Sequence, residues 1–156
     1  MDKEQTGRVL DRMRALCSRR EYCRADMMKK VVSALDGDRA EAEKIVDMLV
    51  KDKYIDDLRY ASAFARDKSA LSGWGQTKIR YALSIKGVSN DLISKALDEI
   101  DGDRAQLRLG KLLENKMRSL KDDPQWKMKL IRFASGRGYS YDEIYDELQK
   151  IDCRRD

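Results

Sequence analysis

Apolar residues recur three and four positions apart along nearly the whole chain, which is the spacing that places side chains on one face of an α-helix. In the first half the apolar stripes are Leu10, Met13, Cys17; Val31, Ala34, Leu35; Ala42, Ile45, Val46, Leu49; and Ala61, Phe64, Leu71. In the second half they are Ile79, Ala82, Leu83; Ile93, Ala96, Leu97, Ile100; Leu109, Leu112, Leu113; Leu130, Phe133, Ala134; and Ile144, Leu148, Ile151. The pattern predicts about nine amphipathic helices.

The stripes also match one another when the chain is shifted against itself without gaps. A shift of 48 positions pairs Val31 with Ile79 and Ile45 with Ile93. A shift of 51 positions pairs Ile93 with Ile144 in the same way. These matches indicate a repeat of about 50 residues, which is long enough for three helices and their turns.

Two short segments support the repeat because they carry the same turn chemistry. Lys86-Gly87-Val88-Ser89 and Arg137-Gly138-Tyr139-Ser140 both follow a predicted helix. In each, the glycine suits a left-handed helix end and the serine suits the N-cap of the next helix. Both segments are therefore predicted to be turns between the second and third helices of a repeat.

Composition agrees with a helical fold. The 156 residues are 42% hydrophobic and 39% charged, with one proline and nine glycines, which suits long helices better than turn-rich sheets. The predicted fold class is all-α, with three tandem three-helix repeats in an elongated, curved array. We expect the first repeat at 1–54 with a short polar N-terminal tail, the second at 55–101, and the third at 102–156 with a short C-terminal tail.

Charge alternates along the chain in step with the repeat. The first and second helices are basic, and the third helices are acidic. The net charge is +5 over 8–30, −4 over 36–57, +5 over 58–90, −4 over 91–103, +7 over 104–139 and −3 over 140–151. Such bands can be ordinary solvated helix faces. Basic stripes also suit a polyanion, whereas interleaved acidic stripes repel a continuous phosphate backbone, so the pattern favours a protein partner that itself carries DNA.

Catalytic and metal chemistry find little support in the sequence. The chain has no histidine, which removes the usual general base and the usual nitrogen ligand for metals. The carboxylate pairs Asp56-Asp57 and Asp122-Asp123 lie at predicted helix starts, where acids act as caps. Gly73-Trp74-Gly75 lacks the remaining residues of a phosphate-binding loop. We therefore expect no enzyme activity, no metal and no cofactor.

The expected compartment is the cytoplasm. No apolar run approaches the roughly 20 residues that span a membrane, and the first five residues are too polar for a signal peptide. Cys17, Cys23 and Cys153 are odd in number and lack paired spacing, which argues against a disulfide framework. A monomer with reduced thiols and no membrane partner is predicted.

Residues 49–68, LVKDKYIDDLRYASAFARDK, resemble the signature of the RecX family of RecA regulators. The likeness continues through GWGQTKIRYAL at 73–83 and Lys-Gly-Val at 86–88. Upstream, residues 16–22 are similar to the opening of the family's first repeat, and residues 131–133 with 137–140 to its third. The chain departs from the family at Cys23 with Asp26-Met27, which weakens a capping box, and at Trp74, where proline is commoner.

The resemblance implies a modular protein that binds in the groove of the RecA filament on DNA. Family members inhibit strand exchange, ATP hydrolysis and coprotease function, and some bind single- or double-stranded DNA weakly. The resemblance therefore also implies a role in homologous recombination, DNA repair and the SOS response. The alternatives that the residues leave open are a sequence-independent DNA-binding module and a helical scaffold for another protein.

The best-matched repeat supplies the candidate partner-binding residues, six of them basic with little counter-charge nearby in the sequence. They are Arg59, Arg66, Lys68, Trp74, Lys78, Arg80 and Lys86. Each cation has an alternative role in an ion pair or lying over the core. Trp74 is either an exposed anchor or a plug at the core edge.

Overall fold

The structure is a computed structural model that describes residues 2–155. Within this range every regular element is a helix, and no strand forms. The helices are α1 (Lys3–Arg19), α2 (Arg24–Ala34), α3 (Arg39–Lys51), α4 (Asp57–Ala70), α5 (Gln76–Ile85), α6 (Asn90–Asp98), α7 (Gly102–Arg118), α8 (Trp126–Gly136) and α9 (Tyr141–Arg155). The all-α prediction is confirmed.

The residues paired by the self-matches occupy equivalent buried positions. Val31 on α2 and Ile79 on α5 are both fully buried. Ile45 on α3, Ile93 on α6 and Ile144 on α9 are likewise buried. The repeat therefore reflects a recurring set of core positions, one set for each group of three helices.

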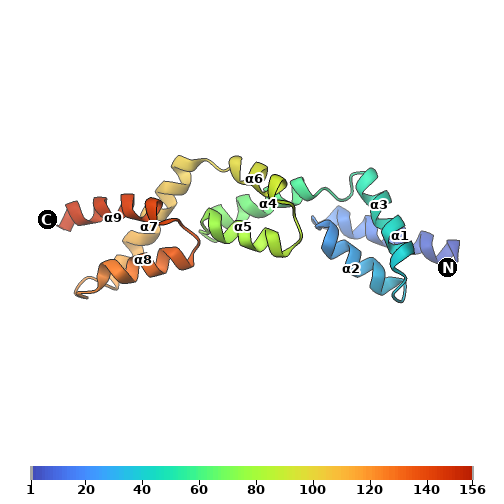
Figure 1. Ribbon diagram of the computed structural model, residues 1–156, viewed down its shortest axis with the longest axis horizontal. Coiled ribbons are helices and arrows are strands. Elements are labelled where there is room, and N and C mark those ends of the chain that lie inside the picture. Colours follow the sequence, from blue (N-terminus) through green and yellow to red (C-terminus); the bar gives the residue numbers. More distant parts are fainter. Residues whose placement is uncertain (1, 156) are drawn as a thin grey trace. The chain divides into compact units, whose positions relative to one another are not determined.

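The chain divides into two compact units. One unit holds the residues up to Ser62 together with Leu83–Ile93, and the other holds Ala63–Ala82 together with the residues from Ser94 onward. In the first unit α1, α2 and α3 pack against one another (Figure 1), around a core that includes Met13, Met27 and Leu49.

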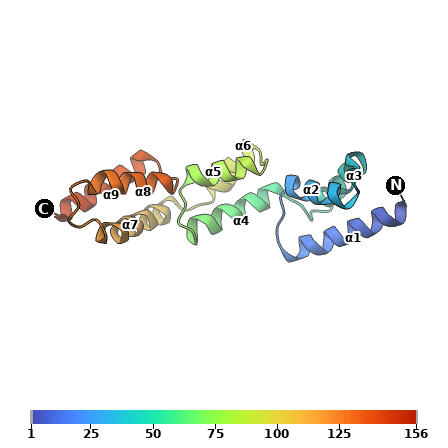
Figure 2. The same ribbon diagram turned by 90° about the horizontal axis from the view of Figure 1, so that it is seen from below.

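In the second unit α7, α8 and α9 form a similar group of three packed helices (Figure 2). Their core includes Leu109, Leu113, Leu130 and Ile144, and none of these is more than 1% exposed. Burying a leucine-sized side chain contributes roughly 1.5–3 kcal/mol, so these few residues hold the three helices together.

The predicted turns have the expected backbone. Gly87 and Gly138 have φ angles of 81° and 96°, the left-handed region that glycine enters without strain. The Ser140 hydroxyl accepts from the Glu143 N–H at 3.3 Å, and the Glu143 carboxylate accepts from the Ser140 N–H at 2.9 Å. This reciprocal capping box starts α9.

One assignment from the apolar pattern is wrong. Leu71 was predicted to continue the core stripe of Ala61 and Phe64, yet 83% of its surface is exposed. The buried face of α4 is formed by Ala61, Ala65 and Ser69, and Leu71, directly after the last residue of the helix, lies off that face. Leu71 instead opens the loop to α5.

Candidate functional site

Trp74 lies in the loop between α4 and α5, and three other side chains contact its ring. Two belong to predicted partner-binding residues, and the third is aromatic. The ammonium groups of Lys68 and Lys78 lie 4.7 and 4.5 Å from its ring centroid. The Phe64 ring meets it edge to face at 6.2 Å. We call Phe64, Lys68, Trp74 and Lys78 the Trp74 cluster. Trp74 is half-buried, so it packs at the core edge while part of its ring reaches the surface.

The loop that carries Trp74 is fixed by the turn after α8. The Gly75 N–H donates to the Arg137 carbonyl at 2.7 Å, and the Thr77 N–H donates to the Gly138 carbonyl at 3.1 Å. The Tyr139 hydroxyl donates to the Gly73 carbonyl at 3.0 Å. Burial raises the pKa of Tyr139, which keeps this hydroxyl protonated as a donor. We call this set of contacts the glycine junction.

The glycine junction depends on a missing side chain. A Cβ placed on Gly75 would lie 2.4 Å from the Gly138 carbonyl oxygen, far closer than two such atoms approach. The two turns can therefore touch only through glycine. This close approach holds the backbone under Trp74 in place.

Arg59 and Lys86 do not fit the prediction of cations with little counter-charge nearby. Arg59 Nε donates to the Glu21 carboxylate, and Lys86 Nζ donates to Asp26 Oδ2 at 2.9 Å. Each hydrogen bond raises the pKa of the cation that makes it. The acids lie 38 and 60 residues away in the sequence, so inspection of neighbouring residues missed them.

The pair between Lys86 and Asp26 belongs to a second set of contacts, which joins the start of α2 to the turn between α5 and α6. The Cys23 thiol donates to the Lys86 carbonyl at 3.7 Å. Ala25 lies 3.5 Å from the position that a Cβ on Gly87 would take. We call this set the ionic junction, because the pair between Lys86 and Asp26 lies within it.

Asp56 and Asp57 act as caps, as predicted, but on two different helices. Asp56 Oδ1 accepts from the Arg59 N–H at 3.0 Å and so caps α4, its own helix. Asp57 Oδ1 accepts from the Arg24 N–H at 2.8 Å, at the first residue of α2. The N-cap of α2 is Cys23, which makes no side-chain capping bond, as its departure from serine predicted. Asp57 supplies the missing acceptor.

The remaining predicted cations are exposed or bonded to neutral groups. Arg66 is exposed on α4, and Arg80 Nη2 donates to Ser94 Oγ at 3.3 Å. Among the ion pairs of residues 2–155, none includes Arg66, Lys68, Lys78 or Arg80. Of the seven predicted site residues, the structure thus brings three together at the Trp74 cluster and holds two in ion pairs.

Three further cations line a pocket beside the loop that carries Trp74, and the sequence did not single them out. Arg108, Lys111 and Arg137 face it together with Leu71 and Gly73. They come from α7 and from the turn after α8, so no local motif links them. The only signal in the sequence was the high positive charge of 104–139.

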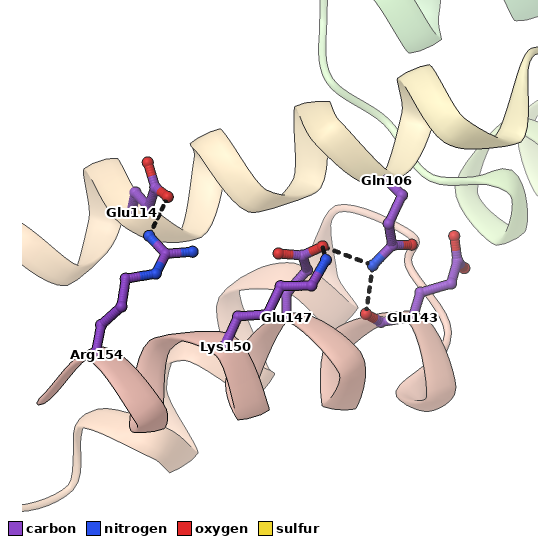
Figure 3. A network of polar contacts seen from close by, with 6 residues as sticks. All are labelled: Gln106, Glu114, Glu143, Glu147, Lys150 and Arg154. Atoms are coloured by element: carbon purple, nitrogen blue, oxygen red, sulfur yellow. Dashed lines mark hydrogen bonds and ion pairs between the residues drawn. The ribbon is translucent and has the colours of Figure 1, made fainter. Parts of the chain in front are cut away.

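A polar seam joins α7 to α9 within the second unit (Figure 3). Glu147 is 5% exposed, and its carboxylate accepts from Gln106 and from Lys150, each at 3.0 Å. A Cβ on Gly110 would lie 2.9 Å from this carboxylate, so the small residue makes room for it. Arg154 and Glu114 pair at 2.6 Å further along the same helices. Because every group of the seam has a partner, we assign it to stability.

Residues 2–155 also bear on two other kinds of site, metal centres and membrane-spanning helices. In that range no three histidine, cysteine or acidic side chains are grouped as ligands for a metal ion. None of the helices there has the length and apolar character needed to cross a membrane.

Two family models match the chain. The model described as the second three-helix domain of RecX matches residues 56–97, and that of the third three-helix domain matches residues 108–148. The first matched region contains the Trp74 cluster. The second contains Arg108, Lys111 and Arg137.

Two solved structures are also similar to this chain. A crystal structure of RecX from Lactobacillus salivarius has a TM-score of 0.85 at 22% identity and covers 96% of this chain and 98% of its own. A crystal structure of a regulatory protein RecX has a TM-score of 0.83 at 23% identity, over 94% of this chain and 72% of its own. At these identities the likeness establishes the fold.

Relatives named regulatory protein RecX are similar in sequence. One from Clostridium botulinum (strain Eklund 17B / Type B) is 37% identical over 117 residues, which are 72% of this chain and 54% of that protein. One from Vibrio campbellii is 33% identical over 132 residues, 83% of this chain and 82% of that protein. The chain spans about half the length of the clostridial relatives. The two domain matches and the Vibrio relative show that this chain belongs to the RecX family of regulatory proteins.

Proposed function

We propose that the chain regulates a RecA recombinase by binding the RecA filament on DNA, and that it inhibits strand exchange, ATP hydrolysis and coprotease activity. The observation that carries the proposal is the pair of RecX domain matches over 56–97 and 108–148. The alternating charge bands support a protein filament as the target, because acidic helices between the basic ones disfavour a long strand of bare nucleic acid.

The basic residues without ion pairs are the proposed contacts. Arg66, Lys68, Lys78 and Arg80 form no ion pair within residues 2–155. Trp74 adds an aromatic face of the kind enriched at binding hot spots. Arg59 and Lys86 have acidic partners and would have to exchange them to bind. We rank these two last among the predicted contacts.

We also propose that the chain acts by binding alone, in the cytoplasm, as a monomer and without a cofactor. The complete lack of histidine supports a binding role, since the usual side chain for proton transfer near neutral pH is missing.

The direct test is the ATPase activity of RecA on single-stranded DNA. Substoichiometric amounts of the chain are expected to depress ATP hydrolysis. Unchanged hydrolysis at equimolar protein would contradict the proposal. A pull-down that recovers a different protein as the main partner would favour a general helical scaffold instead.

The site is tested by changing Arg66, Lys78 and Arg80 together to alanine. Inhibition should be lost while helical content, measured by circular dichroism, is kept. The matched control changes Lys95, Arg118 and Lys121, which are exposed cations outside the proposed contacts. Full inhibition by the first variant, or equal loss in the control, would argue against this site.

A further inference from the structure

A second face of α8, separate from the one in the core, forms a largely apolar groove. The residues that line the groove all come from α8 and recur at helical spacing: Met128, Ile131, Arg132, Ser135 and Gly136. We call these residues the α8 groove. Met128 is 62% exposed, whereas Leu130 and Ala134 are buried in the core of the second unit. The helix therefore has an apolar surface beyond the one that its own unit uses.

Gly136 widens the groove without a reason inside the fold. Its φ angle is not positive, and a Cβ placed on it would meet nothing within 4 Å. Alanine would fit at this position, and alanine favours a helix over glycine. The close approach of another backbone does require glycine, as the contact between Gly75 and Gly138 illustrates. The choice of glycine here points to a chain that packs against α8 from outside.

The repeat does not account for the groove either. A shift of 51 positions aligns α5 with α8 and pairs the core residues Ile79 and Leu130, which are both fully buried. The same shift places Ile85 of α5 at the position of Gly136, and Arg80 at the position of Ile131. The core positions are thus kept, while the groove positions differ. The groove is not something that the three-helix fold needs.

The charge of α8 indicates what kind of chain would fit. The helix contains no acidic residue. Lys127 and Lys129 pair with acids elsewhere in the second unit. Arg132 lies in the groove and forms no ion pair within residues 2–155. The complementary surface is apolar and carries a carboxylate that reaches Arg132.

A second copy of this chain meets that description poorly. In a twofold pair of antiparallel α8 helices, Met128 of each copy would lie over Gly136 of the other, which is a good steric match. Arg132 stands midway between these two positions, so the twofold axis would bring the two Arg132 side chains together. Like charges at such a centre repel each other. The charge therefore favours a different protein as the occupant.

We propose that the α8 groove binds an amphipathic helix of a partner protein. Apolar side chains of that helix pack on Met128 and Ile131, and an acidic side chain at its edge pairs with Arg132. Gly136 lets the two helices approach closely, as small side chains do in helix packing and helix-in-groove recognition. The inference goes beyond the proposed function, because the α8 groove shares no residue with the proposed contacts to RecA.

The test uses the full chain, without RecA, and a fluorescein-labelled model peptide of about 18 residues, longer than the length at which isolated helices are marginal. Its leucines recur at positions i, i+3, i+4 and i+7, and glutamates flank them. A second peptide has lysine in place of glutamate, and a third has the residues of the first in scrambled order. Binding is followed by fluorescence anisotropy.

Gly136→Ala is the main variant, because it should keep or raise the stability of the fold. Its matched control is Gly7→Ala, which makes the same change on α1, where a Cβ also meets nothing within 4 Å. Arg132→Glu tests the charge. Lys95→Glu makes the same change of charge on α6, outside the groove. Circular dichroism checks that each variant keeps its helices.

The glutamate peptide is expected to bind more tightly than the scrambled one. Gly136→Ala should weaken binding at least about fivefold, because the added methyl group holds the two helices apart, whereas Gly7→Ala should leave binding unchanged. Arg132→Glu should lose the glutamate peptide and gain the lysine peptide. Lys95→Glu should keep the original preference. Such an exchange of preference would not follow from a general loss of structure.

Four outcomes would overturn the inference. The first is equal binding of the glutamate and scrambled peptides, and the second is full binding by Gly136→Ala. The third is self-association in sedimentation experiments that Met128→Ala removes, which would make a second copy the occupant. The fourth is binding to phosphatidylserine vesicles that Met128→Ala removes, which would assign the groove to a membrane surface. None of these involves the RecA assay, so failure here leaves the proposed function standing.

Discussion

Replacing Gly75 with alanine should destabilise the second unit through the glycine junction. The new Cβ would lie 2.4 Å from the Gly138 oxygen and 2.5 Å from its carbonyl carbon, and both are backbone atoms that cannot rotate away. The φ angle of Gly75 is not positive, so the effect is steric and adds no conformational strain of its own. The turn after α8 must therefore move back.

The magnitude follows from what that movement disturbs. Overpacking against fixed atoms costs about 1–3 kcal/mol. This movement of the turn also lengthens the hydrogen bonds that the Gly75 and Thr77 N–H groups donate to it. Each such hydrogen bond contributes about 0.5–1.5 kcal/mol. A loss of about 3 kcal/mol in the free energy of unfolding is expected, which lowers the thermal midpoint by about 6–12 °C for a chain of this size.

The assay is thermal and urea denaturation followed by circular dichroism. The matched control is Gly136→Ala, where a Cβ meets nothing within 4 Å and the residue lies in α8. That change should be neutral, or stabilise by up to about 1 kcal/mol, because alanine favours a helix over glycine. Equal stability of the two variants would refute the steric account of the junction.

Three other perturbations test separate parts of the fold. Asp57→Ala should cost about 1–2 kcal/mol in urea denaturation, because the start of α2 loses its acceptor, whereas Asp57→Asn should cost less; equal losses would argue against capping. Burial raises the pKa of Asp26, but the hydrogen bond and the charge of Lys86 outweigh burial and leave this pKa below its usual value. The stability that the pair contributes is therefore present above about pH 4 and is lost as the carboxylate protonates at lower pH. Lys86→Gln should therefore show a smaller acid-induced loss of stability than the unmodified chain. Finally, Met27→Ala should lower the free energy of unfolding by about 2–5 kcal/mol, because Met27 is fully buried. Leu71→Ser should change it by no more than about 0.5 kcal/mol, and a large loss would show that Leu71 belongs to the core after all.

The sequence predicted well whatever depends on local spacing. Helical periodicity identified Ile79 and Leu83 as core residues, and both are fully buried. Glycine followed two positions later by serine identified the turns at Gly87 and Gly138, where φ is positive. These features are set within one helix or one turn, so the order of residues contains them.

Local spacing could not predict the contacts between helix groups. A self-match shows which positions are equivalent, but not which position in one repeat touches another. Asp57 accepts from the N–H of Arg24, 33 residues away, and Arg108 reaches Ser69 over 39 residues. The acidic partners of Arg59 and Lys86 and the pocket cations were missed for this reason, since side-chain chemistry alone leaves many pairings open.

The two junctions span the same length of chain, and this sets an order for folding as the protein is synthesised. The thiol of Cys23 bonds to the carbonyl of Lys86, 63 residues later, and Gly75 meets Gly138, which is also 63 positions further on. Helices and their local packing need no such distant partner and form early. On the ribosome the ionic junction therefore stays open until Lys86 has emerged, and the glycine junction stays open until Gly138 has emerged. A nascent chain halted near residue 80 lacks both the Lys86 partner of Asp26 and the turn that is hydrogen-bonded to the Trp74 loop.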